Sequence, residues 1–396
     1  MATFSTHSLT VTVQTEEGGE WDGVLNPIGA RITLDEGWAP YCQCEVTVTT
    51  PTDSNLEEID PRHNPRVTVT VGQQWILPVR DPQTRTFDLL VRELEVDHAT
   101  GQTVLKLESD EAYLIDAALV MPEPDASRMA LAPSFRAVVN DVLLDFGAGL
   151  IPGDVDYDFS ATPEALTQDP GTTYWDFLQP LVQTSGLRLF CDELRQWRLV
   201  KPASYSVDGQ LNLSTDSNLA ESIDTISRYG DWYDSVVVKY SWDDAEGVSR
   251  TAYDIALSPG ELIGGLTLPY TVPYQLATYV THVSKSLTLE WETPYPGPGA
   301  AKAILDRSIG RGRQLELSAQ NDYTATPGMT LVASLPDTPI QTGSVSSVEW
   351  QMGDAYDMTV GSRGLIDTPT TSWMFAPNGR SWDSVQAGID WTEYTA

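Results

Sequence analysis

Acidic side chains are the residues of this sequence whose spacing comes nearest to a chemical site. In the stretch GLIPGDVDYDF, Asp154, Asp156 and Asp158 occupy alternate positions, as the ligands of a calcium-binding loop do. The EF-hand pattern fails, because Phe159 stands where that loop needs glycine and Ala165 where it needs a bidentate glutamate. A solvated acidic loop is therefore the better interpretation of this stretch.

The rest of the sequence carries no recognisable catalytic pattern. The chain carries 56 aspartates and glutamates, so a glycosidase-like carboxylate pair could be drawn almost anywhere and carries little information. No phosphate-binding Walker loop, GxSxG elbow, HExxH motif or dinucleotide fingerprint is present. The four histidines lie far apart and lack zinc-ligand spacing. We therefore predict no catalytic residue, no metal site and no cofactor.

The three cysteines do not form a disulfide framework. Cys42 and Cys44 are two residues apart in YCQCEVTV, which places them on one face of a strand, where the geometry for a bridge is poor. Cys191 is distant from both in the sequence. We expect all three to be buried or half-buried free thiols.

The charge balance restricts the partners of the protein. Asp and Glu number 56 against 23 Lys and Arg, which gives a formal net charge of −33. Such a surface repels phosphate backbones, so specific binding of nucleic acid is not expected. The charge favours either simple solubility or a surface that nucleic acid must pass without adhering.

The length and the hydropathy pattern set further limits. With 396 residues the chain exceeds the size at which one hydrophobic core stops growing, so two to four domains are expected. No apolar run approaches the roughly 20 residues of a membrane helix, so membrane insertion is not expected. The first residues lack the basic start and apolar stretch of a secretory signal, which predicts folding in a cytoplasm.

Residues 8–122 read as antiparallel β-structure. SLTVTV, ARITLDE, CEVTVTT and RVTVTV alternate apolar and polar residues with period two, and turn-forming residues separate them. The stretch from Thr86 to Asp110 predicts a hairpin that turns at DHATGQ. Short strands with few helices are typical of a small barrel or sandwich.

A helix and a hairpin follow in the middle of the chain. After a first predicted helix that carries Phe135, Val138, Val139, Val142 and Leu143 on one face, residues 174–200 read YWDFLQPLVQTSGLRLFCDELRQWRLV. Thr173 caps the second helix, Pro180 bends it and Gly186 ends it. We predict an αββ unit whose core is formed by Trp175, Leu178, Leu187, Leu189 and Trp197, so that Trp175→Ala should give insoluble or misassembled protein.

The remaining third of the chain returns to strands. A hairpin is predicted from residue 231 to 256 with its turn near Asp243–Gly247, and helices over 271–287 and 299–309. The basic residues at the end of the second of these helices suit its dipole; they are Lys302, Arg307, Arg311 and Arg313. RQLELSAQ, MTLVASL, GSVSSVEWQ and AYDMTVGS predict the last strands.

Three tryptophans recur every nine residues in the last segment. Trp373, Trp382 and Trp391 stand among Asn, Gly, Ser and Asp, with neither helix nor strand periodicity. We predict an extended arm that places these indoles in pockets of an adjacent subunit or another protein, as aromatic anchors do. The alternative is an unstructured terminus.

Two parts of the sequence resemble each other. Residues 90–116 and 343–367 each show a strand that ends in a glutamate flanked by apolar residues, a turn with glycine, a return strand and a closing LID. The flanked glutamates are Glu95 and Glu349. This similarity predicts two related barrels, one near each end of the chain.

The order of these pieces resembles a known family. TTYWDFLQPLVQTSGLRLFCDELRQWRLV is similar to the helix–hairpin unit of hub-type minor tail proteins from siphophages that infect Actinobacteria. ARITLDEGWAPYCQCEVTV resembles the first barrel of that family through Asp35, Trp38, Pro40 and Tyr41. YGDWYDSVVVKYSW, TPGMTLVASL and GSVSSVEWQMGDAYDMTV look like its later strands.

The resemblance implies a mainly β fold with an α+β insertion, in which two tail-tube-like antiparallel β-barrels flank an αββ-containing middle region. The implied domains are the first barrel at 1–122, an α/β insertion at 123–205, a hairpin with connecting helices at 206–309, the second barrel at 310–370 and an arm at 371–396.

The resemblance also implies a function. The chain would be a structural, non-enzymatic hub protein at the virion tail tip of a long-tailed phage, assembled in the host cytoplasm. It would form a homotrimeric ring that joins the sixfold tail tube to threefold tip proteins and lets DNA pass. Its partners would be the distal tail protein, the tape measure and the fibre or receptor-binding proteins. Any lytic or receptor-binding module would then be a separate polypeptide, because this chain stops just past the second barrel.

Two alternatives remain open. One is the distal tail protein, which is usually a hexamer. The other is a tail protein that binds or hydrolyses carbohydrate of the cell envelope.

Overall fold

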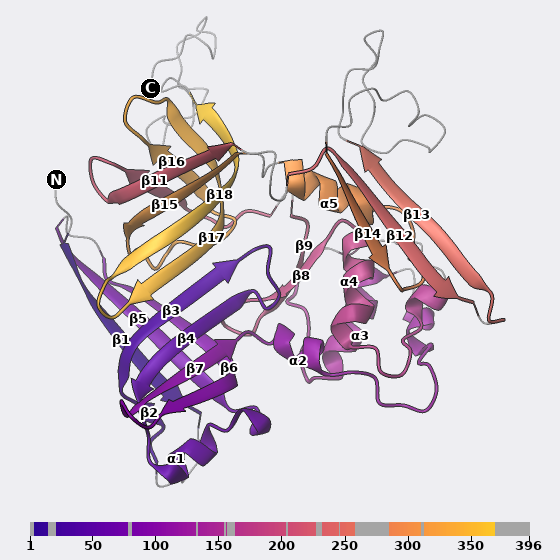
Figure 1. Ribbon diagram of the computed structural model, residues 1–396, viewed down its shortest axis with the longest axis horizontal. Coiled ribbons are helices and arrows are strands. Elements are labelled where there is room, and N and C mark those ends of the chain that lie inside the picture. Colours follow the sequence, from indigo (N-terminus) through magenta and orange to yellow (C-terminus); the bar gives the residue numbers. More distant parts are fainter. Residues whose placement is uncertain are drawn as a thin grey trace, which may run out of the picture.

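The computed structural model of the chain, drawn in Figure 1, describes most of the residues. The described ranges are 4–14, 21–77, 81–131, 134–153, 156, 163–202, 205–226, 232–244, 246–257, 285–309 and 313–368. The predicted arm at 371–396, with Trp373, Trp382 and Trp391, lies outside them. So does most of the predicted helix at 271–287.

The first seven strands curve into a barrel (Figure 1). They are β1 (Phe4–Val13), β2 (Val24–Leu25), β3 (Pro27–Asp35), β4 (Cys42–Thr49), β5 (Arg66–Leu77), β6 (Gln83–Asp97) and β7 (Gln102–Glu108). They pair antiparallel in the order β3-β4-β7-β6-β5-β1-β2, and β2 leads directly into β3, so the ends of the row lie beside each other. Alternate residues are buried, as the period-two pattern predicts.

A short helix covers one end of this barrel. It is α1 (Asp53–Glu58), followed by the 3-10 helix η1 (Pro61–His63), which the Asp60 side chain caps by accepting a hydrogen bond from the Arg62 backbone. The three cysteines lie as predicted, buried and free, with Cys42 and Cys44 on one face of β4.

The α/β insertion follows the first barrel. Its helices are α2 (Glu111–Asp116), η2 (Ser127–Leu131), α3 (Phe135–Leu144), η3 (Glu164–Leu166) and α4 (Tyr174–Thr184), and its hairpin is β8 (Arg188–Cys191) with β9 (Trp197–Val200). The predicted apolar face of α3 is buried. The Thr173 hydroxyl accepts a hydrogen bond from the Asp176 backbone and so caps α4, Pro180 lies within that helix, and Gly186 follows it with a φ of 66°.

The α/β insertion and a three-stranded sheet together form a second lobe of the molecule, beside the lobe formed by the barrels (Figure 1). It contains β12 (Ser235–Asp243), β13 (Ser249–Leu257) and β14 (Ser286–Trp291), and α5 (Ala300–Ile309) packs on one face of it. Asp254 of β13 caps α5 by accepting hydrogen bonds from the backbones of Gly299 (2.9 Å) and Ala301 (2.8 Å). Residues 286–287 were predicted as helix and are strand, because SLTLEW alternates with period two and pairs parallel with β12.

The second barrel draws its strands from two parts of the sequence. They are β10 (Gln210–Ser214), β11 (Leu219–Ile226), β15 (Arg313–Gln320), β16 (Thr330–Ser334), β17 (Ile340–Met352) and β18 (Asp357–Thr368). β10 pairs with β16 and β11 with β15. Residues 210–226 therefore belong with the predicted second barrel at 310–370, although the sequence boundaries placed them in the segment 206–309.

The long hairpin β17–β18 joins the two barrels. One edge of β17 pairs first with β16 and then, over Ser347–Met352, with β3 of the first barrel. Thirteen strands of the described residues consequently form one continuous sheet, and one apolar core runs through both barrels. The mainly β fold with two barrels and an α/β insertion agrees with the fold class expected from the sequence. The barrels were expected to be antiparallel, and their strands do pair antiparallel except for β10, which pairs parallel with β16.

The internal sequence similarity corresponds only in part to the structure. Residues 90–108 and 343–368 both form antiparallel hairpins, β6–β7 and β17–β18. The LID triplets differ, because Leu114–Asp116 end helix α2 whereas Leu365–Asp367 lie in strand β18. The last three matched residues are therefore not structurally equivalent.

Candidate functional site: the hairpin junction and a basic cavity

The hairpin β8–β9 lies between two apolar cores. Successive residues of a strand point to opposite faces, and here both faces are covered. Leu189, Cys191, Trp197 and Leu199 belong to the core of the α/β insertion. Phe190 and Val200 point the other way and belong to the core of the barrels. The hairpin therefore joins the insertion to the barrels by packing.

The predicted core of the αββ unit comes together, with one difference. Leu178, Leu187, Leu189 and Trp197 are buried in a single cluster. Trp175 is only partly buried and packs at the edge of that cluster, while Phe177 takes the buried place in the same helix. The structure thus places Trp175, which was predicted as a core residue, at the edge of this core.

A buried glutamate holds the hairpin against the first barrel. Oε1 of Glu111, at the start of α2, accepts hydrogen bonds from the backbone N–H groups of Tyr41 (3.2 Å) and Cys191 (2.9 Å). Burial raises the pKa of this carboxyl above its ordinary value, and the hydrogen bonds that it accepts oppose that rise. Glu111 therefore links three segments that lie far apart in the sequence.

Ion pairs surround this glutamate. The Asp110 carboxylate contacts Arg66 of β5 (2.9 Å) and Arg195 of the hairpin turn (3.1 Å). Arg66 also contacts Asp88 of β6 at 2.9 Å. Because Arg66 and Asp110 are largely buried, removing one partner would leave the other charge without compensation.

Arg85 connects the hairpin with both barrels. Its Nε donates to Glu193 of the hairpin turn (2.9 Å), and its Nη1 donates to the backbone oxygens of Tyr323 (3.1 Å) and Ala325 (2.7 Å) in the second barrel. Its guanidinium lies 5.1 Å from the ring centre of Trp350. Such a contact is favourable for a cation over an aromatic face.

The acidic loop has a capping role where it is described. Asp156 accepts hydrogen bonds from the Ser134 hydroxyl (2.9 Å) and the Arg136 backbone (3.1 Å), at the start of α3. Asp154 and Asp158 lie outside the described residues. In the described part of the chain, no group of three or more His, Cys, Asp or Glu side chains is placed to hold a metal ion.

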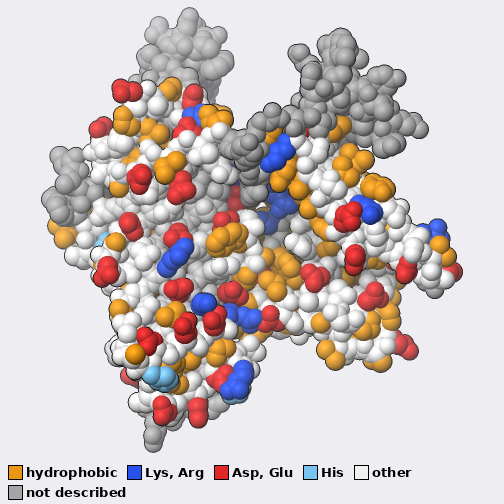
Figure 2. Space-filling model, in the orientation of Figure 1, with side chains coloured by type: hydrophobic (Ala, Val, Ile, Leu, Met, Phe, Trp, Pro, Cys, Tyr) orange, Lys and Arg blue, Asp and Glu red, His pale blue; other side chains and the backbone are white. Residues whose placement is uncertain are grey.

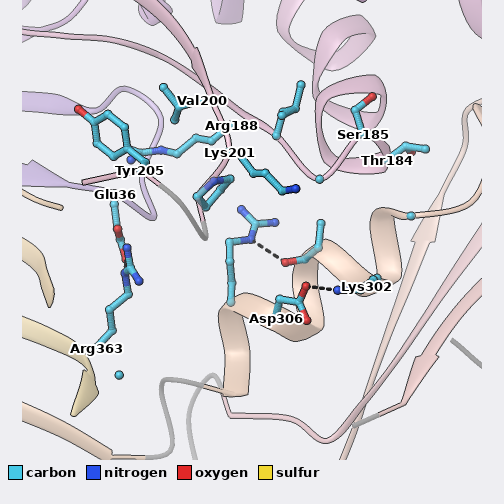
Figure 3. A pocket seen from close by; sticks show the side chains of 17 residues that line it. Glu36, Thr184, Ser185, Arg188, Val200, Lys201, Tyr205, Lys302, Asp306 and Arg363 are labelled. Carbon is cyan, nitrogen blue, oxygen red and sulfur yellow. Dashed lines mark hydrogen bonds and ion pairs between the residues drawn. The ribbon is translucent and has the colours of Figure 1, made fainter. Parts of the chain in front are cut away.

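A cavity of about 500 Å³ lies between the barrels and the insertion. Its walls come from the end of α4, from β8, from β9 and the residues after it, and from α5 (Figure 3). The barrels contribute Glu36, which directly follows β3, and part of β18. At one rim α4 and α5 approach so closely that a Cβ on Gly299 would stand 2.1 Å from the Thr184 backbone oxygen. Glycine is therefore required there.

Basic side chains gather in this cavity. Five of its lining residues are basic and two are acidic; they are Arg188, Lys201, Lys302, Arg307 and Arg363, with Glu36 and Asp306. Figure 2 shows basic side chains in the hollow between the two lobes, and both acidic and basic ones spread over the rest of this face. Arg363 pairs with Glu36, and Lys302 pairs with Asp306.

Arg188 packs against two aromatic rings. Its guanidinium lies 4.4 Å from the ring centre of Phe190 and 5.2 Å from that of Tyr41. Burial lowers the pKa of its guanidinium from the ordinary value. Its Nη2 donates a hydrogen bond to the Asp35 backbone oxygen at 3.5 Å.

Sequence reasoning found the basic cluster near the end of α5 but not its surroundings. Lys302 and Arg307 line the cavity, whereas Arg313 pairs with Asp224 and Asp367 in the second barrel. Arg311 lies outside the described residues. Glu111, Arg85 and Arg188 were missed, because nothing local in the sequence distinguishes them from other charged residues.

Comparison with known proteins rests on structure alone. No protein-family model matches the sequence, and no curated protein matches it. A tail protein from Neisseria meningitidis MC58 superposes with a TM-score of 0.55 at 9% identity, covering 90% of this chain and 96% of that one. The 43 kDa tail protein of prophage MuSo2 from Shewanella oneidensis gives 0.56 at 14% identity, covering 90% and 98%.

These two matches extend over nearly the full length of each protein. The chain therefore shares its overall fold with these two tail proteins. At these levels of identity the similarity concerns the fold. None of the helices in the described part of the chain has the length and apolar character needed to span a membrane.

Proposed function

We propose that this chain is a structural hub protein at the tail tip of a long-tailed phage, of the kind found in siphophages that infect Actinobacteria. It forms a homotrimeric ring that joins a sixfold tail tube to threefold tip proteins and lets DNA pass. It has no enzymatic role. The distal tail protein, the tape measure and the fibre or receptor-binding proteins are its proposed partners in the virion.

The observation that carries this proposal is the pairing of β3 with β17. It fixes two barrels side by side in one chain, so three chains present six barrels in one ring. Closed cyclic symmetry is the usual arrangement of such assemblies. A ring of this kind offers six similar surfaces to a tube and three distinct ones to the tip. The fold shared with tail proteins supports the same assignment.

The buried charged groups support a structural role. Glu111, Asp110 and Arg85 make hydrogen bonds and ion pairs that hold the insertion and the barrels together. Perturbed carboxyl groups are often catalytic, but here the raised pKa of Glu111 has a structural explanation in its burial between three segments. We infer that these groups serve assembly.

The acidic surface suits a channel for DNA. Three copies triple the formal net charge of −33, and exposed charges act over about 8 Å at physiological salt. An acidic lumen would therefore repel phosphates only where DNA comes close to the wall. That short range lets DNA move through a wide ring without adhering to it.

Native mass spectrometry of the purified chain tests the proposal. We expect a homotrimer, and we expect the same protein in the tails of intact virions. A hexamer would instead assign the chain to the distal tail protein. A stable monomer that binds or degrades cell-envelope carbohydrate would overturn the structural role.

A further inference from the structure

The basic cavity between the barrels and the insertion has the character of a binding site. It gathers five of the 23 basic side chains of a chain whose net charge is −33. Among the described residues that line the cavity, the acidic ones are Glu36 and Asp306. Coulomb attraction is strongest at such a partly enclosed site, because the surrounding protein excludes water. The cavity therefore favours a ligand that carries negative charge.

The walls of the cavity are also partly apolar, so a ligand that fills it needs apolar groups as well as negative charge. Leu187, Val200, Pro202 and Ala303 line it together with the Tyr205 ring. Figure 3 shows the Lys201 side chain extending among these walls, with Tyr205 and the paired Glu36 and Arg363 on one side and α5 on the other. A bare inorganic anion would leave the apolar walls uncovered. A peptide segment that combines carboxylates with aromatic side chains would cover both kinds of surface.

One segment of this chain has that composition. Residues 381–396 read SWDSVQAGIDWTEYTA, with three carboxylates, two tryptophans and a tyrosine, and without lysine or arginine. The carboxylates belong to Asp383, Asp390 and Glu393. Charge and apolar character therefore both complement the cavity.

The length of the chain places this segment within reach. Arg363 and Gly364 of β18 line the cavity, and that strand ends at Thr368. The residues 369–380 that follow can span up to about 40 Å when extended at roughly 3.3–3.6 Å per residue. Residues 381–396 can thus reach the cavity of the same chain or that of a neighbouring copy in a ring.

We propose that the basic cavity is the docking site for residues 381–396. Their carboxylates meet Lys201, Arg307 and Arg188, and an indole lies against the apolar wall. The sequence predicts that the tryptophans of this segment dock in pockets of an adjacent subunit or another protein. Within the proposed ring, on which this inference rests, the basic cavity is their specific receptor.

Zero-length cross-linking tests the assignment on the full chain. A carbodiimide joins a lysine to a carboxylate that contacts it, and mass spectrometry identifies the linked peptides. We expect links from Lys201 or Lys302 to Asp383, Asp390 or Glu393, and fewer of them in 1 M salt, where the screening length falls to about 3 Å. Lys239, which pairs with Glu290 on the exposed face of the three-stranded sheet, is the control and should link only locally.

A charge swap distinguishes specific docking from a general attraction. Lys201→Glu should abolish the links and raise hydrogen exchange in residues 381–396 several-fold, and Lys201→Glu with Asp390→Lys should restore protection. Lys239→Glu should change neither measurement. Links from Lys201 and Lys302 to Asp306 and Glu36 alone, or unchanged exchange in Lys201→Glu, would overturn the assignment.

Mixing copies labelled with heavy and light isotopes shows which chain supplies the segment. Links within one copy or between two copies both support the cavity as the receptor. The oligomeric state is measured separately by native mass spectrometry. Failure of the docking site therefore cannot be confused with failure of the trimer.

Discussion

At the scale of single residues, buried charge holds the two lobes of this protein together. Glu111 is fully buried, and its Oε1 accepts two backbone hydrogen bonds from segments on either side of it. Its Oε2 has no hydrogen-bond partner among the described residues. The carboxyl is therefore needed as an acceptor, whereas its negative charge is costly at this position.

Substitution of Glu111 should separate the benefit of its accepted hydrogen bonds from the cost of its buried negative charge. Because burial raises the folded-state pKa of Glu111 above the ordinary 4.5, the folded chain holds this proton more tightly than the unfolded chain. The bound proton therefore contributes to the free energy of unfolding. This contribution is complete below pH 4.5 and is lost as the pH rises through the raised pKa of Glu111. We expect Glu111→Gln to gain stability relative to the unmodified protein as the pH rises.

Glu111→Ala should be less stable than Glu111→Gln at every pH. It leaves two buried backbone N–H groups without an acceptor, at a cost of about 1–3 kcal/mol each. Urea denaturation from acidic to neutral pH measures both variants, with Glu246→Gln in an exposed turn as the control. If the free energies of unfolding of Glu111→Gln and the unmodified protein differed by the same amount across that pH range, the argument would be contradicted.

At the scale of elements, the hairpin β8–β9 is a connector. Its two faces belong to two different cores, so the apolar pattern LRLFC…QWRLV has few exposed positions. A strand buried on both faces reads as a nearly continuous apolar run. This explains why a stretch so rich in large apolar residues is not accompanied by catalytic residues.

Two tryptophans of this unit should differ in their effect on stability. Trp197 is 3% exposed, whereas Trp175 is only partly buried at the rim. Trp197→Ala should cost about 3–5 kcal/mol and give largely insoluble or misassembled protein. Trp175→Ala should cost clearly less, in contrast to the expectation from the sequence. Soluble yield and urea midpoints compare the two, and equal losses would show that the rim position is wrong.

At the scale of the whole molecule, the two barrels share one continuous sheet and one apolar core. Trp350 of β17 is fully buried between them, with its ring centre 6.1 Å from that of Phe87 and 6.2 Å from that of Tyr323. Its indole N–H donates to the Asp322 backbone oxygen at 3.0 Å. A residue that packs on both barrels couples their stabilities.

Trp350→Ala should therefore destabilise both barrels together. We expect hydrogen exchange to accelerate by similar factors in β5 of the first barrel and β16 of the second, with a single unfolding transition for the two. Tyr240→Ala, in the separate core under α5, is the control and should act mainly on β12–β14. Acceleration in β16 without change in β5 would show that the barrels unfold independently.

The sequence alone determined the local elements. Period-two alternation located the strands of the first barrel, and the Thr173 cap and Gly186 located the ends of α4, because these signals depend on residues within a few positions of each other. Only the tertiary structure assigned β10 and β11 to the second barrel, joined β3 to β17, and brought basic residues from β8 and α5 to one cavity. Strand pairing and buried charge join residues such as Arg85 and Ala325 that are 240 positions apart. Periodicity records which side of an element is buried, but the choice of the partner that buries it depends on the packing of the complete chain.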